Sequence, residues 1–244
     1  MPTLVILMAS TLAGSAISGM TGLAGGTLIL AVVASVVQTE FIIPLHAAVA
    51  FMSNGARVTL FYRHIRWRIV GYFMLGMLPG AFIGINVFRM LDEHVIRLAM
   101  GIFILAVVLL PVSGNGKGDE NRTFVPVGFF AGLLGIFFGS IGPLIARFFL
   151  RSDISKEELV GTKAACQALG HLVKIPLFGI VIGANILLYS RVLLYLGTMV
   201  MIGVLAGRMM LHRITEREFR IVYRVLLSVI ALRIIVVEML DMIA

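Results

Sequence analysis

The sequence predicts an all-α integral membrane protein made of two inverted structural repeats, each a glycine-broken helical hairpin followed by three transmembrane helices. Three observations support this fold class. Sixty per cent of the 244 residues are hydrophobic and 13% are charged, whereas about 25% are charged in an ordinary soluble domain. Long uncharged apolar runs recur along the chain, and blocks of the first half reappear in the same order in the second. We therefore expect the chain to lie in a lipid bilayer.

The apolar runs define the expected membrane segments. One helical span requires about 20 residues, so the chain is expected to cross the bilayer about seven to ten times. The last run, 219–237, is amphipathic, and the run 164–190 is interrupted by His171 and Lys174. The runs are 4–37, 41–56, 69–88, 98–116, 123–146, 164–190, 192–207 and 219–237.

An internal repeat divides the chain into two halves. Three pairs of blocks match in the same order, namely 19–28 with 132–141, 42–61 with 159–178 and 80–98 with 203–221. We therefore predict a first membrane repeat over 1–113, a solvated linker over 114–122 within SGNGKGDENR, and a second membrane repeat over 123–244.

The positions of the basic loops indicate that the halves are inverted. RHIRWR (63–68) lies between the second and third segments of the first half, whereas RMMLHRITEREFR (208–220) lies between the third and fourth segments of the second half. Basic loops of membrane proteins tend to face the cytoplasm. If both loops do so, each half contains an odd number of crossings and one segment that turns back.

The segment that turns back is predicted at glycine-rich breaks. The run 4–37 carries GMTGLAGG at its centre, and residues 123–150 carry GLLGIFFGSIGP. Each is interpreted as two short helices that meet at the break. Non-helical backbone at membrane depth is tolerated where it is buried in protein or lines a cavity. Inverted repeats with broken helices near the midplane are typical of secondary transporters.

The breaks carry the first set of candidate binding residues. A helix that begins after a break directs free N–H groups and the positive end of its dipole into the protein, which suits an anion. The alternative is that the glycines serve close helix packing, which is the favoured interpretation for Gly80, Gly84, Gly203 and Gly207. The candidates at the breaks are Ser18, Gly25, Gly26, Thr27, Gly139 and Ser140.

A polar stripe on two matching segments supplies the second set. The spacing i, i+8, i+11 places three side chains of each helix within roughly 80° of arc. Gln167 falls on the same stripe. The aligned pairs are His46 with Lys163, Asn54 with His171, and Arg57 with Lys174.

The stripes are cationic and have few acidic partners in sequence. No Asp or Glu occurs between Glu40 and Asp92, or between Glu158 and Glu216. Buried cations normally pair, so a bound anion could supply the counter-charge. Two alternatives stay open: the cations near the helix ends could snorkel to the membrane surface, and His171 could be a hydrogen-bonded structural residue or a proton relay.

Composition excludes several other classes. The net charge of +8 is carried by short loops and helix ends, as topology signals are, so nucleic-acid binding is not expected. Cys166 is the single cysteine and is expected to be a small buried hydrophobe, which excludes an intrachain disulfide and a CxxC metal site. The sequence has no P-loop, so ATP is not expected to drive the protein directly. We expect no cofactor and no metal.

These residues and motifs resemble the sulfite exporter TauE/SafE-like family of membrane proteins. The resemblance covers nearly the whole chain through GLAGGTL, GIFFGSIGPL, PLHAAVAFMSNGARV, GTKAACQALGHLVKIPLFG and PGAFIG. It implies a small transporter of two related halves that moves sulfite, organosulfonates or related anions across the bacterial inner membrane.

The sequence therefore predicts a secondary transporter of a small anion, expected to be an exporter, that works by alternating access and is not an enzyme. The alternatives are an anion channel, a transporter of another small solute, and an intramembrane serine hydrolase using Ser140 and His171. The hydrolase is disfavoured because the other half has no matching serine and histidine pair. A coupling proton or sodium ion and a homodimer are left open.

Overall fold

The structure is a computed structural model, and it describes residues 2–21, 25–109, 120–149, 154–210 and 216–243. These residues form ten α-helices and two short 3-10 helices, with no strand among them. The elements are α1 Pro2–Thr21, α2 Gly25–Val36, α3 Thr39–Phe61, η1 Tyr62–His64, α4 Trp67–Phe88, α5 Glu93–Leu109, α6 Glu120–Phe138, α7 Gly142–Phe149, α8 Lys156–Val181, η2 Ile186–Tyr189, α9 Ser190–Met210 and α10 Glu216–Ile243.

Five stretches of the described chain are long and apolar enough to cross a membrane, and the protein is therefore a multi-pass membrane protein. They are Pro2–Gly19, Thr39–His64, Trp67–Phe88, Glu157–Val181 and Ile186–Gly207. The larger number of crossings expected from the sequence stays a prediction. Most of the predicted linker 114–122 lies outside the described residues, and α6 begins at Glu120.

Both predicted breaks interrupt a helix, but the helices before them are not short. The helix α1 has 20 residues and α6 has 19, whereas α2 has 12 and α7 has eight. At about 1.5 Å per residue, α1 and α6 alone approach the thickness of the hydrocarbon layer. The expectation of two short helices per hairpin was therefore wrong. The glycines before the breaks do not end α1 or α6, because a helix tolerates Gly at a modest cost when packing supports it.

The first hairpin turns back on itself at a glycine contact. A Cβ added to Gly25 would lie 1.7 Å from the carbonyl oxygen of Gly14, and a Cβ added to Gly14 would lie 2.6 Å from the side chain of Ile29. These contacts set the start of α2 against the second half of α1. The close approach of the two backbones requires glycine at both positions.

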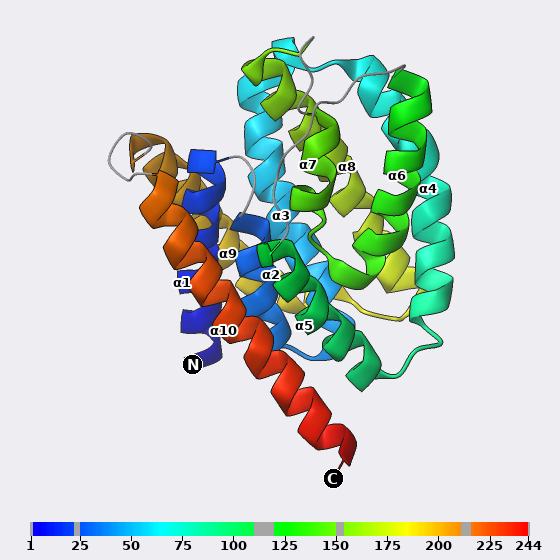
Figure 1. The fold of residues 1–244 in the computed structure, drawn as a ribbon, viewed down its shortest axis with the longest axis vertical. Helices are drawn as coiled ribbons and strands as arrows, with labels where there is room; N and C mark the ends of the chain where they lie inside the picture. Colours follow the sequence, from blue (N-terminus) through cyan, green and yellow to red (C-terminus); the bar gives the residue numbers. More distant parts are fainter. Residues whose placement is uncertain (1, 22–24, 110–119, 150–153, 211–215, 244) are drawn as a thin grey trace.

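The halves interlock through helices of opposite halves (Figure 1). The helix α4 of the first half packs on α6 of the second, and α9 of the second half packs on α1 of the first, with α3 and α8 packed together between these pairs. The helices α5 and α10 also pack on each other.

Glycines make the close contacts at both outer pairs, as expected. A Cβ at Gly80 or Gly84 would lie 2.1 or 2.9 Å from a backbone oxygen of α6. A Cβ at Gly203 or Gly207 would lie 2.6 or 2.1 Å from a backbone oxygen of α1. The packing role predicted for these four glycines is confirmed.

An ion pair fixes the register of the central helices. Ser155 and Glu158 form a capping box at the start of α8, which satisfies two of the free N–H groups there. Arg66, just after α3 and η1, donates to both carboxylate oxygens of Glu158 at 3.1 Å, and its backbone N–H donates to Thr162 Oγ1 at 3.0 Å. The end of α3 is thereby attached to the start of α8, so the two helices run antiparallel.

Candidate functional site

The polar stripes of α3 and α8 are buried inside the protein. Arg57, Lys163 and Lys174 are only 8%, 2% and 3% exposed. Side chains that snorkel must reach the surface, so the snorkelling alternative is wrong for these three cations. His46, Asn54 and His171 are buried as well, and Gln167 is half-buried.

The two stripes face each other, as the alignment of the halves suggested. The rings of His46 and His171 meet edge to face, with centroids 5.5 Å apart. Lys163 lies within electrostatic range of Arg57, and Lys174 within range of both histidines. Antiparallel packing of α3 and α8 therefore gathers the polar residues of both halves into one cluster.

The two glycine breaks also meet at this cluster. Thr27 Oγ1, at the start of α2, lies 3.3 Å from Ser140 Oγ in the second break. Residues separated by 113 positions are thus in hydrogen-bond contact. Residues 22–24 of the first break lie outside the described residues, but the start of α2 reaches the second break directly.

His46 bridges the two breaks. Its Nε2 atom lies 3.0 Å from the carbonyl oxygen of Gly26 in the first break. Its Nδ1 atom faces Gly139 in the second, where an added Cβ would lie 3.1 Å away. Gly139 has φ 60°, a backbone conformation that glycine adopts without steric cost. A residue expected only to supply charge therefore also contacts the backbone of the first break and faces the second.

Lys174 contacts the second break from the other side. Its Nζ atom donates to the carbonyl oxygen of Gly139 at 2.8 Å. A Cβ at Gly135 would lie 3.0 Å from the same Nζ atom, so this glycine makes room for the ammonium group. The carbonyl of a broken helix lacks an intrahelical partner, and Lys174 supplies one. The sequence indicated the charge of Lys174 but not this contact.

Two cavities adjoin the cluster and share Gln167 and His171. The first is lined by most of the predicted site residues, and Ser53, which the sequence did not indicate, joins them. Besides Gly26, its lining includes the polar residues Ser18, His46, Ser53, Asn54, Arg57, Ser140, Gln167 and His171. The second contains Gly139 and Lys174, and most of its other lining residues are apolar, among them Phe73 and Met77.

Three predicted site residues line neither of these two cavities. Lys163 is buried within electrostatic range of Arg57. Gly25 serves the close contact with α1. Thr27 contacts Ser140, so it acts behind the cavity lining. Ser140 thus makes its hydrogen bond with Thr27, and that contact does not form a serine and histidine dyad.

Several buried polar atoms at the cavity have no hydrogen-bond partner within the described part of the protein. They are His46 Nδ1, His171 Nδ1, Ser53 Oγ and Asn54 Oδ1. A buried polar atom without a partner costs about 1 to 3 kcal/mol. The arrangement therefore suits a polar ligand that contacts these atoms.

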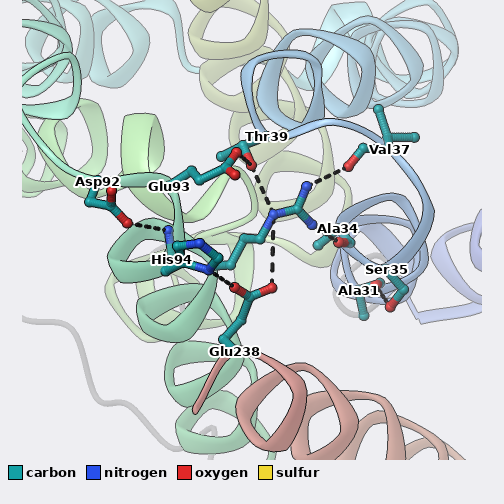
Figure 2. A network of polar contacts seen from close by, with 10 residues as sticks. Ala31, Ala34, Ser35, Val37, Thr39, Asp92, Glu93, His94 and Glu238 are labelled. Carbon is teal, nitrogen blue, oxygen red and sulfur yellow. Dashed lines mark hydrogen bonds and ion pairs between the residues drawn. The ribbon is translucent and has the colours of Figure 1, made fainter. Parts of the chain in front are cut away.

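A second polar network, which the sequence did not indicate, holds the far end of α2 (Figure 2). Arg97 of α5 donates to the carbonyl oxygens of Ala34 and Val37 at 2.8 and 2.9 Å, and to Thr39 Oγ1 at 2.8 Å. The Ala34 carbonyl lies in the last turn of α2 and that of Val37 directly follows the helix, where carbonyls lack helical partners. Arg97 therefore anchors the short helix whose other end reaches the cavity.

Glu238 of α10 completes this network. One carboxylate oxygen lies 2.9 Å from His94 Nδ1, and the other lies 3.9 Å from Arg97 Nε. His94, Glu238 and Asp241 also place ligand atoms within 4.8 Å of one another, the one such group among the residues searched. Because Glu238 is engaged by His94 and Arg97, an ion pair accounts for its position.

The contact with Glu238 predicts a pH-dependent stability. Its hydrogen bond to His94 raises the pKa of this histidine above the ordinary 6.5. A histidine whose pKa is raised in the folded state stabilises the protein at pH values below its ordinary pKa. This stabilisation is lost as the pH rises through the raised pKa. The unfolding temperature of His94→Gln in detergent should therefore fall below that of wild type in mildly acidic buffer, and the difference should shrink as pH rises. His64→Gln is the control, and a difference independent of pH would contradict the prediction.

The described fold and cluster define a class of protein. It is an all-helical, multi-pass membrane protein with interrupted helices and buried cations beside cavities, which are features of membrane transport proteins. The family model described as Sulfite exporter TauE/SafE matches residues 6–234. The chain belongs to this family, and the resemblance stated from the sequence is confirmed. Neither the curated proteins nor the solved structures include a match to the chain.

Proposed function

We propose that the protein is a secondary transporter that exports a small anion, such as sulfite, an organosulfonate or a related organic anion, from the bacterial cytoplasm across the inner membrane. The observation that carries this proposal is the cavity where Arg57 and the start of α2 meet the second break. A cation and a helix N-terminus together favour negative charge. Family membership supports an anion exporter in general.

We assign the cavity residues different roles in binding. Arg57 supplies the charge that attracts the anion, with Lys163 and Lys174 adding positive potential. Charge-assisted hydrogen bonds are about twice as strong as neutral ones. Side chains around the cavity coordinate the remaining oxygen atoms, and these are Ser18, Asn54, Ser140, Gln167 and His171.

We further propose that the two halves are inverted repeats that alternate in opening the cavity. The helix contacts support this, because exchanging the halves turns the α4 and α6 pair into the α9 and α1 pair. The same exchange maps the α3 and α8 pair, and the α5 and α10 pair, onto themselves. Transporters of this kind move one repeat against the other around a central site.

The substitution Arg57→Gln tests the proposed site. Removing a hydrogen bond to a charged group costs about 1.5 to 3 kcal/mol, so sulfite affinity should fall roughly 10- to 100-fold. Two measurements check it, the sulfite-dependent rise in unfolding temperature and the flux of labelled sulfite from proteoliposomes. Arg63→Gln, in the exposed segment after α3, is the matched control. Sulfite flux and affinity of the wild-type level in Arg57→Gln would refute the site.

A further inference from the structure

The hydrogen bonds of His46 determine where its ring can accept a proton. Nε2 lies 3.0 Å from the carbonyl oxygen of Gly26. A carbonyl oxygen only accepts, so Nε2 carries the hydrogen of this bond. In the neutral ring Nδ1 is then an acceptor, and this buried atom has no partner within the described part of the protein.

The charged side chains that the described residues place near His46 are cationic. From α8, His171 contacts the ring and Lys174 lies within electrostatic range. Lys163 of α8 and Arg57 of α3 belong to the same buried cluster. The helices α1 and α2 contain no titratable residue.

We propose that the anion binds together with one proton, which Nδ1 of His46 accepts, and that the anion and this proton cross the membrane together. The inference rests on the proposed function and names its coupling ion. The proton forms an N–H bond at Nδ1 and is released again when the anion leaves, so no redox partner is required.

Charge makes the two binding events cooperative. A proton on His46 adds a positive charge to a buried cluster that already holds Arg57, Lys163 and Lys174, and like charges repel strongly in a low-dielectric interior. The negative charge of an anion in the adjoining cavity offsets this repulsion and so favours the proton on His46. The proton in turn strengthens binding of the anion by the same factor, because coupling between two sites is reciprocal.

The position of His46 connects this proton to the moving parts. Its ring contacts Gly26 of the first break through Nε2 and faces Gly139 of the second through Nδ1. A proton on Nδ1 turns that atom from an acceptor into a donor. The contacts between the two hairpins therefore change when the anion and the proton bind.

The substitution His46→Gln separates the two functions of this ring. The glutamine amide can still donate to the Gly26 carbonyl, but it cannot take up a proton. Proteoliposomes carrying the full chain are equilibrated with labelled sulfite, and the voltage is clamped at zero. A gradient of one pH unit should then produce a sulfite accumulation about tenfold greater in wild type than in the variant, because one transported proton contributes about 1.36 kcal/mol per unit.

The comparison is made on the same substrate, so any proton that sulfite itself carries cancels. The control His64→Gln should behave as wild type, since His64 is exposed and outside the cluster. Equal accumulation by wild type and His46→Gln would leave transport established and overturn the proton proposal. The assignment of the proton to His46 would also be overturned if His171→Gln lost the tenfold accumulation while His46→Gln kept it. Failure of wild type to move sulfite at all would instead refute the proposed function.

A second measurement does not depend on the folding of the variant. In mildly acidic buffer sulfite is already the hydrogen sulfite ion, so any proton taken up on binding must go to the protein. Calorimetric titrations of the wild-type protein with sulfite in buffers of different ionisation enthalpy should report the uptake of about one proton. Sulfite binding without proton uptake would overturn the proposal.

Discussion

Replacement of Gly139 by alanine is expected to abolish sulfite transport and to destabilise the protein. The residue has φ 60°, and a non-glycine residue in this region costs about 1 to 2 kcal/mol. The added Cβ would also lie 2.9 Å from Leu30 Cδ1, 3.1 Å from His46 Nδ1 and 3.2 Å from Ile43 Cδ1. These neighbours belong to α2 and α3, so either their side chains or the second break must shift. Flux in proteoliposomes and the unfolding temperature in detergent measure the two effects.

Gly183 provides a matched control for this substitution. It also has a positive φ, 82°, but an added Cβ would meet nothing within 4 Å. Gly183→Ala therefore carries the backbone cost alone, and its sulfite flux should exceed that of Gly139→Ala at least tenfold. If both variants lose flux equally, the contacts between the breaks do not matter for transport.

The substitution Gly80→Ala is expected to separate α4 from α6 and to lower the free energy of unfolding by roughly 1 to 3 kcal/mol. The added Cβ would lie 2.1 Å from the carbonyl oxygen of Phe129. Backbone cannot rotate away as a side chain can, so the helices must move apart along the interface between the halves. Thermal unfolding and the monodisperse fraction in detergent measure the effect.

Gly71 lies on the same helix and is the control. A Cβ there would meet nothing within 4 Å. Gly71→Ala should be neutral or stabilising by up to about 1 kcal/mol, because alanine favours the helix more than glycine does. A Gly80→Ala variant as stable as Gly71→Ala would show that the interface tolerates separation and would contradict the close packing of the halves.

The sequence predicted the local features of the site because they depend on neighbouring residues. Helical spacing places Lys163, His171 and Lys174 on one face, and all three are buried there. The glycine-rich stretches indicated both helix interruptions. The prediction that the helices before the breaks are short was wrong for α1 and α6, because a glycine within a packed helix does not have to end it.

The roles of individual polar residues depended on contacts between distant parts of the chain. From the sequence we predicted that Lys174 supplies positive charge to a bound anion. Its contact with the Gly139 carbonyl arises where α8 passes the second break. Arg97 was not indicated at all, because its partners at the end of α2 lie about 60 positions earlier in the chain. Spacing along one helix carries no signal for such pairs.

The sequence by itself therefore determined the membrane class, the family, the two breaks and the two polar stripes, since composition, periodicity and motif order carry this information directly. Only the tertiary structure decided that His46 joins the breaks, that Arg57 lines a cavity and that Lys163 lies behind it. The physical reason is that a hydrogen bond or cavity depends on distances of a few ångströms between residues. Those distances are set by the packing of whole helices against one another.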